Sequence, residues 1–186
     1  MAPETIGDMT PLQQPDIIQK AVEYCTHQAD KGLDSLVALM QRTAADWQRT
    51  LDGVSDTQAE FSPAANEWTT KEVVTHFLQA TDGVNRQVEK LTHGKDIGVL
   101  AAAGPDQRPT ETASVAELSD GIASIFDEIV KLTRSLEGNA NLDKQFPHPA
   151  FGQLNITQWI AFQRLHGMDH MQQIDKNRAD AAYPKA

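Results

Sequence analysis

The residues with the clearest chemical potential are His166 and His170, four positions apart in a stretch with helical periodicity, residues 156–177. At this spacing on an α-helix, two side chains lie one above the other, so both imidazoles can bind one ion. They belong to a stripe that begins apolar and becomes polar, made of Ile156, Trp159, Ile160, Gln163, His166, His170, Gln173 and Ile174. The stripe predicts that both rings point inward, where an unpartnered polar group costs about 1 to 3 kcal/mol. A metal ion or a hydrogen-bond network would offset that cost.

A third inward histidine is predicted from a different helix. Thr69 and Glu72 have the spacing of a capping box, which marks a helix start, and His76 follows in the second turn. It lies on the apolar stripe of that helix, formed by Val73, Phe77, Ala80, Val84, Val88 and Leu91. Three neutral imidazoles leave a divalent ion with an open position, which is typical of catalytic rather than structural zinc. We therefore predict a metal site made of His76, His166 and His170.

The elements that must position these residues are four amphipathic helices. Apolar residues at spacings of three and four predict one long helix over residues 16–51 and, after Thr69, a second over residues 70–91. Ser114 and Glu117 form another capping box and open a third helix that ends near Gly138. Asn155 and Gln158 cap the fourth helix, which ends before Pro184. No alternation of period two extends beyond a few residues, so the predicted fold class is all-α, a four-helix bundle.

The connections divide the chain further. Residues 52–68 and 139–155 contain turn-forming residues and are expected to be irregular, while residues 94–109 form a loop long enough to cross the whole bundle. We expect a lead-in over residues 1–15, one bundle domain over residues 16–178 and a tail over residues 179–186.

Composition excludes several classes of function. The chain has 186 residues, of which 40% are hydrophobic and 23% charged, as in an ordinary globular domain. Its net charge of -10, with 16 scattered Lys and Arg residues, argues against nucleic acid as a partner. No apolar run approaches the roughly 20 residues needed to cross a membrane, and no signal sequence is evident. With one cysteine, a disulfide framework is excluded, and a cytoplasmic location is expected.

Two motifs resemble the DinB/YfiT-like superfamily. The run from Trp68 to Phe77 resembles the Trp-Ser-x-x-Glu-x-x-x-His-Leu signature of that family, with threonine after the tryptophan and phenylalanine after the histidine. The segment from His148 through His166 to Gln173 is similar to the closing part of the family pattern. The resemblance implies a bundle with a crossover, a divalent metal on His76, His166 and His170, and a homodimer. It also implies chemistry of the kind known in the family, namely thiol-dependent transferases, isomerases and metal-dependent hydrolases.

The leading hypothesis is a metal-dependent thiol transferase or isomerase that acts on an electrophilic small molecule, with a low-molecular-weight thiol as cosubstrate. A metal-dependent hydrolase using the same ligands is the first alternative. A non-catalytic stress or interaction module, in which the ion only ties two helices together, is the second. Zinc is the preferred ion, with nickel, iron or manganese as alternatives.

Other residues have simpler interpretations. Glu72 could orient a ligand or act as a base, although its capping role suffices to explain it. Gln163 and Gln173 could contact a ligand or the substrate. The remaining candidates are expected to be structural or exposed: Cys25 as an apolar seam residue, His27, His93 and His148 on the surface, and Trp47, Trp68 and Trp159 as packing anchors. No acid or base for proton transfer is evident.

Overall fold

The computed structural model describes residues 15–95, 97, 108–110 and 113–185. The predicted lead-in and much of the predicted crossover loop lie outside these residues. The described elements are six helices and one antiparallel hairpin: α1 (Pro15–Ala29), α2 (Leu33–Leu51), α3 (Asp56–Ala59), α4 (Thr70–Thr92), α5 (Val115–Arg134), β1 (Gln145–His148), β2 (Gly152–Asn155) and α6 (Ile156–Arg178).

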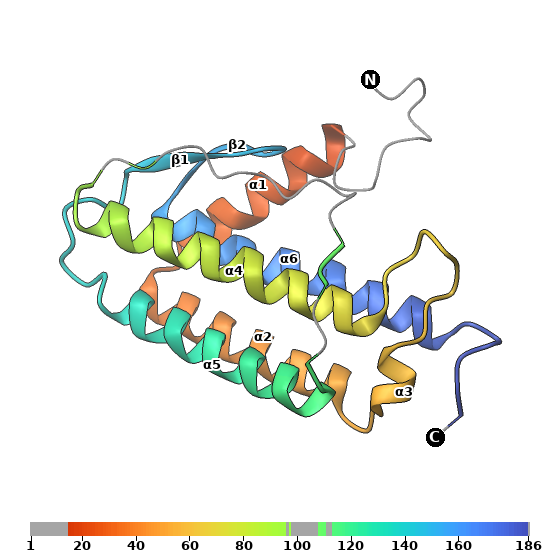
Figure 1. Ribbon diagram of the computed structural model, residues 1–186. Coiled ribbons are helices and arrows are strands. Elements are labelled where there is room, and N and C mark those ends of the chain that lie inside the picture. Colours follow the sequence, from red (N-terminus) through yellow and green to blue (C-terminus); the bar gives the residue numbers. More distant parts are fainter. Residues whose placement is uncertain (1–14, 96, 98–107, 111–112, 186) are drawn as a thin grey trace.

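Four of these helices, α2, α4, α5 and α6, form the predicted bundle (Figure 1). Both α2 and α4 pack against α5 and α6, while α1 lies outside the bundle against α6. Figure 1 shows α4 and α5 running in the same direction, opposite to α2 and α6. Two consecutive parallel helices require a connection that returns along the length of the bundle, which confirms the predicted crossover.

The sequence-based helix starts are confirmed at atomic detail. Reciprocal capping boxes open α4 at Thr69, α5 at Ser114 and α6 at Asn155. Each capping box satisfies two backbone N–H groups that would otherwise lack partners at the helix end. Because a cap fixes where a helix begins, it also fixes which side chains point into the bundle.

The prediction of one long helix over residues 16–51 is wrong. The chain breaks between α1 and α2, where Gly32 has a φ of 87°, a left-handed conformation that favours glycine. The break lets α1 turn away and pack on α6, with Gln158 Nε2 donating to Thr26 Oγ1 at 2.9 Å. The apolar residues of α1, such as Ala21 and Cys25, therefore join the core by packing on α6 and not as part of a longer α2.

The segment predicted to be irregular, residues 139–155, contains the hairpin. Phe146 pairs with Leu154 and His148 with Gly152, whose φ of 73° closes the turn. The hairpin is fixed to α6 because the Phe146 ring stacks on Trp159 at 4.3 Å and the Phe146 carbonyl accepts from Trp159 Nε1 at 3.1 Å. Strands of four residues are too short to show a clear period in the sequence.

The core lies among the four bundle helices and includes Trp47, Phe77 and Phe126, each at most 2% exposed. No helix in the described part of the chain is long and apolar enough to cross a bilayer.

Candidate metal centre

The three predicted histidines converge in the structure. One nitrogen from each of His76, His166 and His170 can be chosen so that all lie within 4.8 Å of one another. His166 Nε2 and His170 Nε2 are 2.9 Å apart, and the ring centre of His76 lies 5.8 and 5.1 Å from those of His166 and His170. Antiparallel α4 and α6 supply these rings, so the cluster joins two helices that are distant in sequence.

Burial keeps these imidazoles neutral, the form that binds metal. Burial, followed by the charge of His170, lowers the pKa of His76 to about 4. Burial and then the neighbouring histidines lower the pKa of His166 well below its usual range. Burial also lowers the pKa of His170, although its contact with Gln173 acts in the opposite direction. Three neutral imidazoles, each with a nitrogen lone pair to offer, fit a divalent ion better than a charged hydrogen-bond network.

Gln173 contacts a candidate ligand directly. Its Oε1 is 3.3 Å from His170 Nδ1, so a proton on Nδ1 leaves Nε2 free to face the other two rings. Glu72 has the simpler role that the sequence suggested: it accepts from Thr69 N at 2.8 Å and lies 3.6 Å from Arg108 Nη1. The carboxylate of Glu72 thus serves the helix cap.

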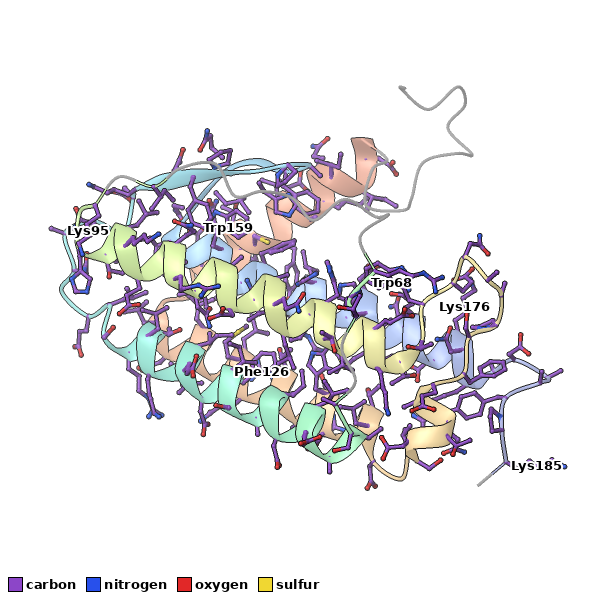
Figure 2. All side chains as sticks on the ribbon, in the orientation of Figure 1. Trp68, Lys95, Phe126, Trp159, Lys176 and Lys185 are labelled. Atoms are coloured by element: carbon purple, nitrogen blue, oxygen red, sulfur yellow. The ribbon has the colours of Figure 1, made fainter. Side chains whose placement is uncertain are left out.

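Aromatic rings enclose the cluster. Phe162 stacks on His166 at 5.6 Å, Phe77 lies 5.2 Å from the same ring, and Trp68 meets His76 edge-on at 5.2 Å. Figure 2 shows Trp68 and Trp159 toward opposite ends of the bundle, with Trp159 beneath the hairpin. Apolar walls of this kind limit the access of water and strengthen electrostatic interactions inside the site.

Two buried donors beside the cluster have no partner among the described residues. Gln163 is 1% exposed; its Oε1 accepts from Thr81 Oγ1 at 3.0 Å, while its Nε2 is unpaired. The Nε1 of Trp47 is also unpaired and lies against Gly167, where an added Cβ would be 2.9 Å away. Gln163 therefore contacts Thr81 on α4 rather than a histidine ring, and Trp47 is a packing anchor with an unsatisfied end.

The other candidate residues from the sequence are either exposed or at least half-buried. His27 and His93 are exposed, as predicted. Cys25 is 1% exposed and burial raises the pKa of its thiol to about 12, which fits an apolar seam residue. The prediction that His148 is exposed is wrong: it is half-buried in β1, among aromatic rings.

Sequence reasoning missed a carboxyl group next to the ligands. Asp169 is half-buried, and this burial raises its pKa. Its helical position places it in the same row as Phe162 and His166, on the side of α6 that faces away from the Trp47 contact. The signal was available, since Asp169 follows His166 by three residues, but a single acidic residue between two histidines is ambiguous.

Comparison with known proteins identifies the class. The family profile of the DinB superfamily matches residues 39–174, which is most of the chain. This protein therefore belongs to the DinB superfamily.

Two particular proteins are similar to this chain. YuaE of Bacillus subtilis (strain 168) is 21% identical over 144 residues, covering 67% of this chain and 85% of YuaE. The structure of YfiT from Bacillus subtilis, described as a probable metal-dependent hydrolase with an unusual four-helix bundle topology, superposes with a TM-score of 0.62. That match has 12% identity and covers 78% of this chain and 85% of YfiT, so it supports the fold.

Proposed function

We propose that this protein is a divalent-metal-dependent enzyme that acts on a small molecule. The observation that carries the proposal is the convergence of His76, His166 and His170 within 4.8 Å, on two different helices and inside aromatic walls. Within the described residues, no Cys, Asp or Glu joins this group. A site with three protein ligands leaves a coordination place for water or substrate, which favours a catalytic role over a purely structural tie.

Each residue of the site would have its own role. His76, His166 and His170 would hold the ion, and Gln173 would fix the orientation of His170. When bound, a divalent ion supplies Lewis-acid chemistry and lowers the pKa of a coordinating water or thiol toward neutrality. The rings of Phe77 and Phe162 would exclude bulk water.

The structure adds one candidate for proton transfer, Asp169, which follows His166 by three residues. Its side chain is half-buried next to the ligand row, and a carboxyl in such surroundings can exchange a proton closer to neutral pH than an exposed one.

The nucleophile distinguishes two reactions. Thiol transfer or isomerisation with a low-molecular-weight thiol is what the family motifs imply. Hydrolysis is favoured by the description of YfiT as a probable metal-dependent hydrolase, together with the shared fold. Both would use the same three ligands, and zinc is the preferred ion for either.

The test combines metal analysis with a substrate panel. Untagged protein should contain about one divalent ion per chain, and the loaded protein should convert electrophiles with thiol, or esters and amides without it. His93→Ala, at an exposed position, is the matched control for His166→Ala. Metal binding without any reaction, together with a fourth protein ligand, would support the structural module instead.

A further inference from the structure

The histidine whose exposure was wrongly predicted, His148, lies close to the candidate metal centre. Its ring is 4.4 Å from Phe151, 5.2 Å from Trp159 and 4.7 Å from Phe162, measured between ring centres. Phe162 in turn stacks on His166, with an angle of 13° between the rings. One aromatic ring therefore separates His148 from a proposed metal ligand.

The hairpin fixes the protonation of this imidazole. The backbone amides of Ala150 and Phe151 lie 3.0 and 3.2 Å from His148 Nδ1. An amide N–H can only donate, so Nδ1 must carry a lone pair, and the neutral ring must carry its proton on Nε2. Burial lowers the pKa of His148 to about 4, which keeps the ring neutral near pH 7.

The Nε2–H group at the other end of the His148 ring is an available hydrogen-bond donor. Nε2 lies on the far side of the imidazole from the amides of the turn, and no described residue accepts its proton in the structure. The ring cannot easily turn, because the hairpin that carries it is held to α6 by the stacked pair Phe146 and Trp159. A rigid neutral donor binds an oxygen acceptor without reorganisation and offers nothing to an ammonium group.

We propose that His148 is a positioning residue, whose Nε2–H donates to a carbonyl or carboxylate oxygen of a molecule bound at the metal centre. This inference rests on the proposed function and deepens it by naming a substrate class. The substrate would have a metal-binding head group and an acceptor oxygen separated from it by about the width of an aromatic ring. The hairpin would thus contribute to specificity, because a molecule without the acceptor would leave the donor unpaired.

The first measurement needs neither metal nor activity. Long-range proton–nitrogen NMR of the histidine rings at pH 7 should show the Nε2–H form for one imidazole, assigned to His148 by its loss in His148→Gln. A protonated Nδ1 or a charged ring at this position would overturn the proposal.

The second measurement tests recognition. Cobalt-loaded protein is titrated with mercaptocarboxylates of increasing chain length, from mercaptopropionate to mercaptohexanoate, and with mercaptoalkylamines of matching length, followed by visible absorption. His148→Phe should lower the preference for the carboxylates over the amines by about tenfold at the best length, since one hydrogen bond is lost. His148→Gln keeps a donor and should retain most of the preference, and His93→Phe is the exposed control.

The outcomes separate the two proposals. Normal cobalt uptake with an unchanged preference in His148→Phe would overturn the positioning role and leave the metal site standing. Absence of cobalt uptake by the wild-type protein would overturn the metal site itself, and the positioning role with it. If His148→Phe fails to fold, His148→Met, which also lacks a donor, takes its place, with the same loss of preference as the expected result and an unchanged preference as the contradicting one.

Discussion

Two stretches of α6 satisfy their buried polar groups differently. In the first turns of the helix, Trp159 is 1% exposed, stacks on Phe146 and donates its Nε1 proton to the Phe146 carbonyl. In the middle of the helix, His166 and His170 lie close to His76, and Gln163 keeps an unpaired Nε2 among the described residues. The side-chain donor of Trp159 thus has a partner, whereas protein atoms only partly satisfy the buried polar groups in the middle of α6.

This difference favours a structural role for the Trp159 end and a functional role for the middle of α6. Packing alone explains the Trp159 end, because its apolar area and its one donor are both accounted for. Packing explains the three imidazoles less well, since each ring loses hydration on burial and the only contact of hydrogen-bond length among the three joins His166 Nε2 to His170 Nε2. The proposed cation would resolve that imbalance, which is why we propose chemistry for the middle of α6.

The largest expected effect comes from His166→Ala. Removing one of three ligands should weaken divalent-metal binding by more than about 100-fold and abolish metal-dependent activity. Inductively coupled plasma analysis after dialysis measures this, with His93→Ala as control. Unchanged metal content in His166→Ala would erase the distinction between the Trp159 end and the middle of α6.

In the first turns of α6, Trp159→Ala should lower the free energy of unfolding by about 3–5 kcal/mol, because it leaves a cavity and removes the anchor of the hairpin. Denaturant titration measures the loss. The variant that remains folded should still bind metal at the wild-type stoichiometry; if metal binding disappears while stability stays constant, the comparison fails.

Acid should act through the buried histidines. Protons bind the unfolded histidines more readily than the folded ones, because the folded pKa values of His76 and His148 are lowered to about 4. The metal-free protein should therefore be fully stable above about pH 6.5 and lose on the order of 2 kcal/mol as the pH falls toward 4. Unfolding curves across this range test the sign; a gain in stability on acidification would contradict it.

Gly167→Ala probes the close contact behind the histidines. The new Cβ would meet Trp47 Nε1 at 2.9 Å, so we expect a loss of about 1–3 kcal/mol. The matched helical control is Gly83→Ala on α4, where nothing lies within 4 Å and a gain of up to about 1 kcal/mol is expected. Equal effects of the two substitutions on the melting temperature would show that the contact is unimportant.

Gln173→Ala should have the smallest effect. Loss of the contact with His170 Nδ1 should weaken metal binding by about tenfold and leave stability nearly unchanged. Competition with a chromogenic chelator measures the affinity, and the exposed neighbour Gln172 provides the control substitution Gln172→Ala. If both variants bind equally, Gln173 does not orient the ring.

Local rules were enough to predict much of this molecule. The capping residues Thr69 and Asn155 fixed the phases of α4 and α6, so the inward direction of His76, His166 and His170 could be predicted from spacing alone. The length of the connection after α4 predicted a crossover, and the parallel directions of α4 and α5 agree with it.

The features that were missed depend on contacts distant in sequence. A small residue such as Gly32 is acceptable on the packed face of the predicted long helix. Only the packing of α1 on α6 reveals the break. The hairpin strands are too short to show a period, and the burial of His148 depends on Trp159 and Phe162 in the following helix. The unpaired Nε2 of Gln163 has no signature in the sequence at all.

The most direct test of the central claim is X-ray absorption spectroscopy of the zinc-loaded protein. We predict three imidazole nitrogens and one exchangeable light-atom ligand at about 2.0 Å, with one imidazole missing in His76→Ala. A spectrum with fewer than three imidazoles, or with four ligands that all come from the protein, would contradict it.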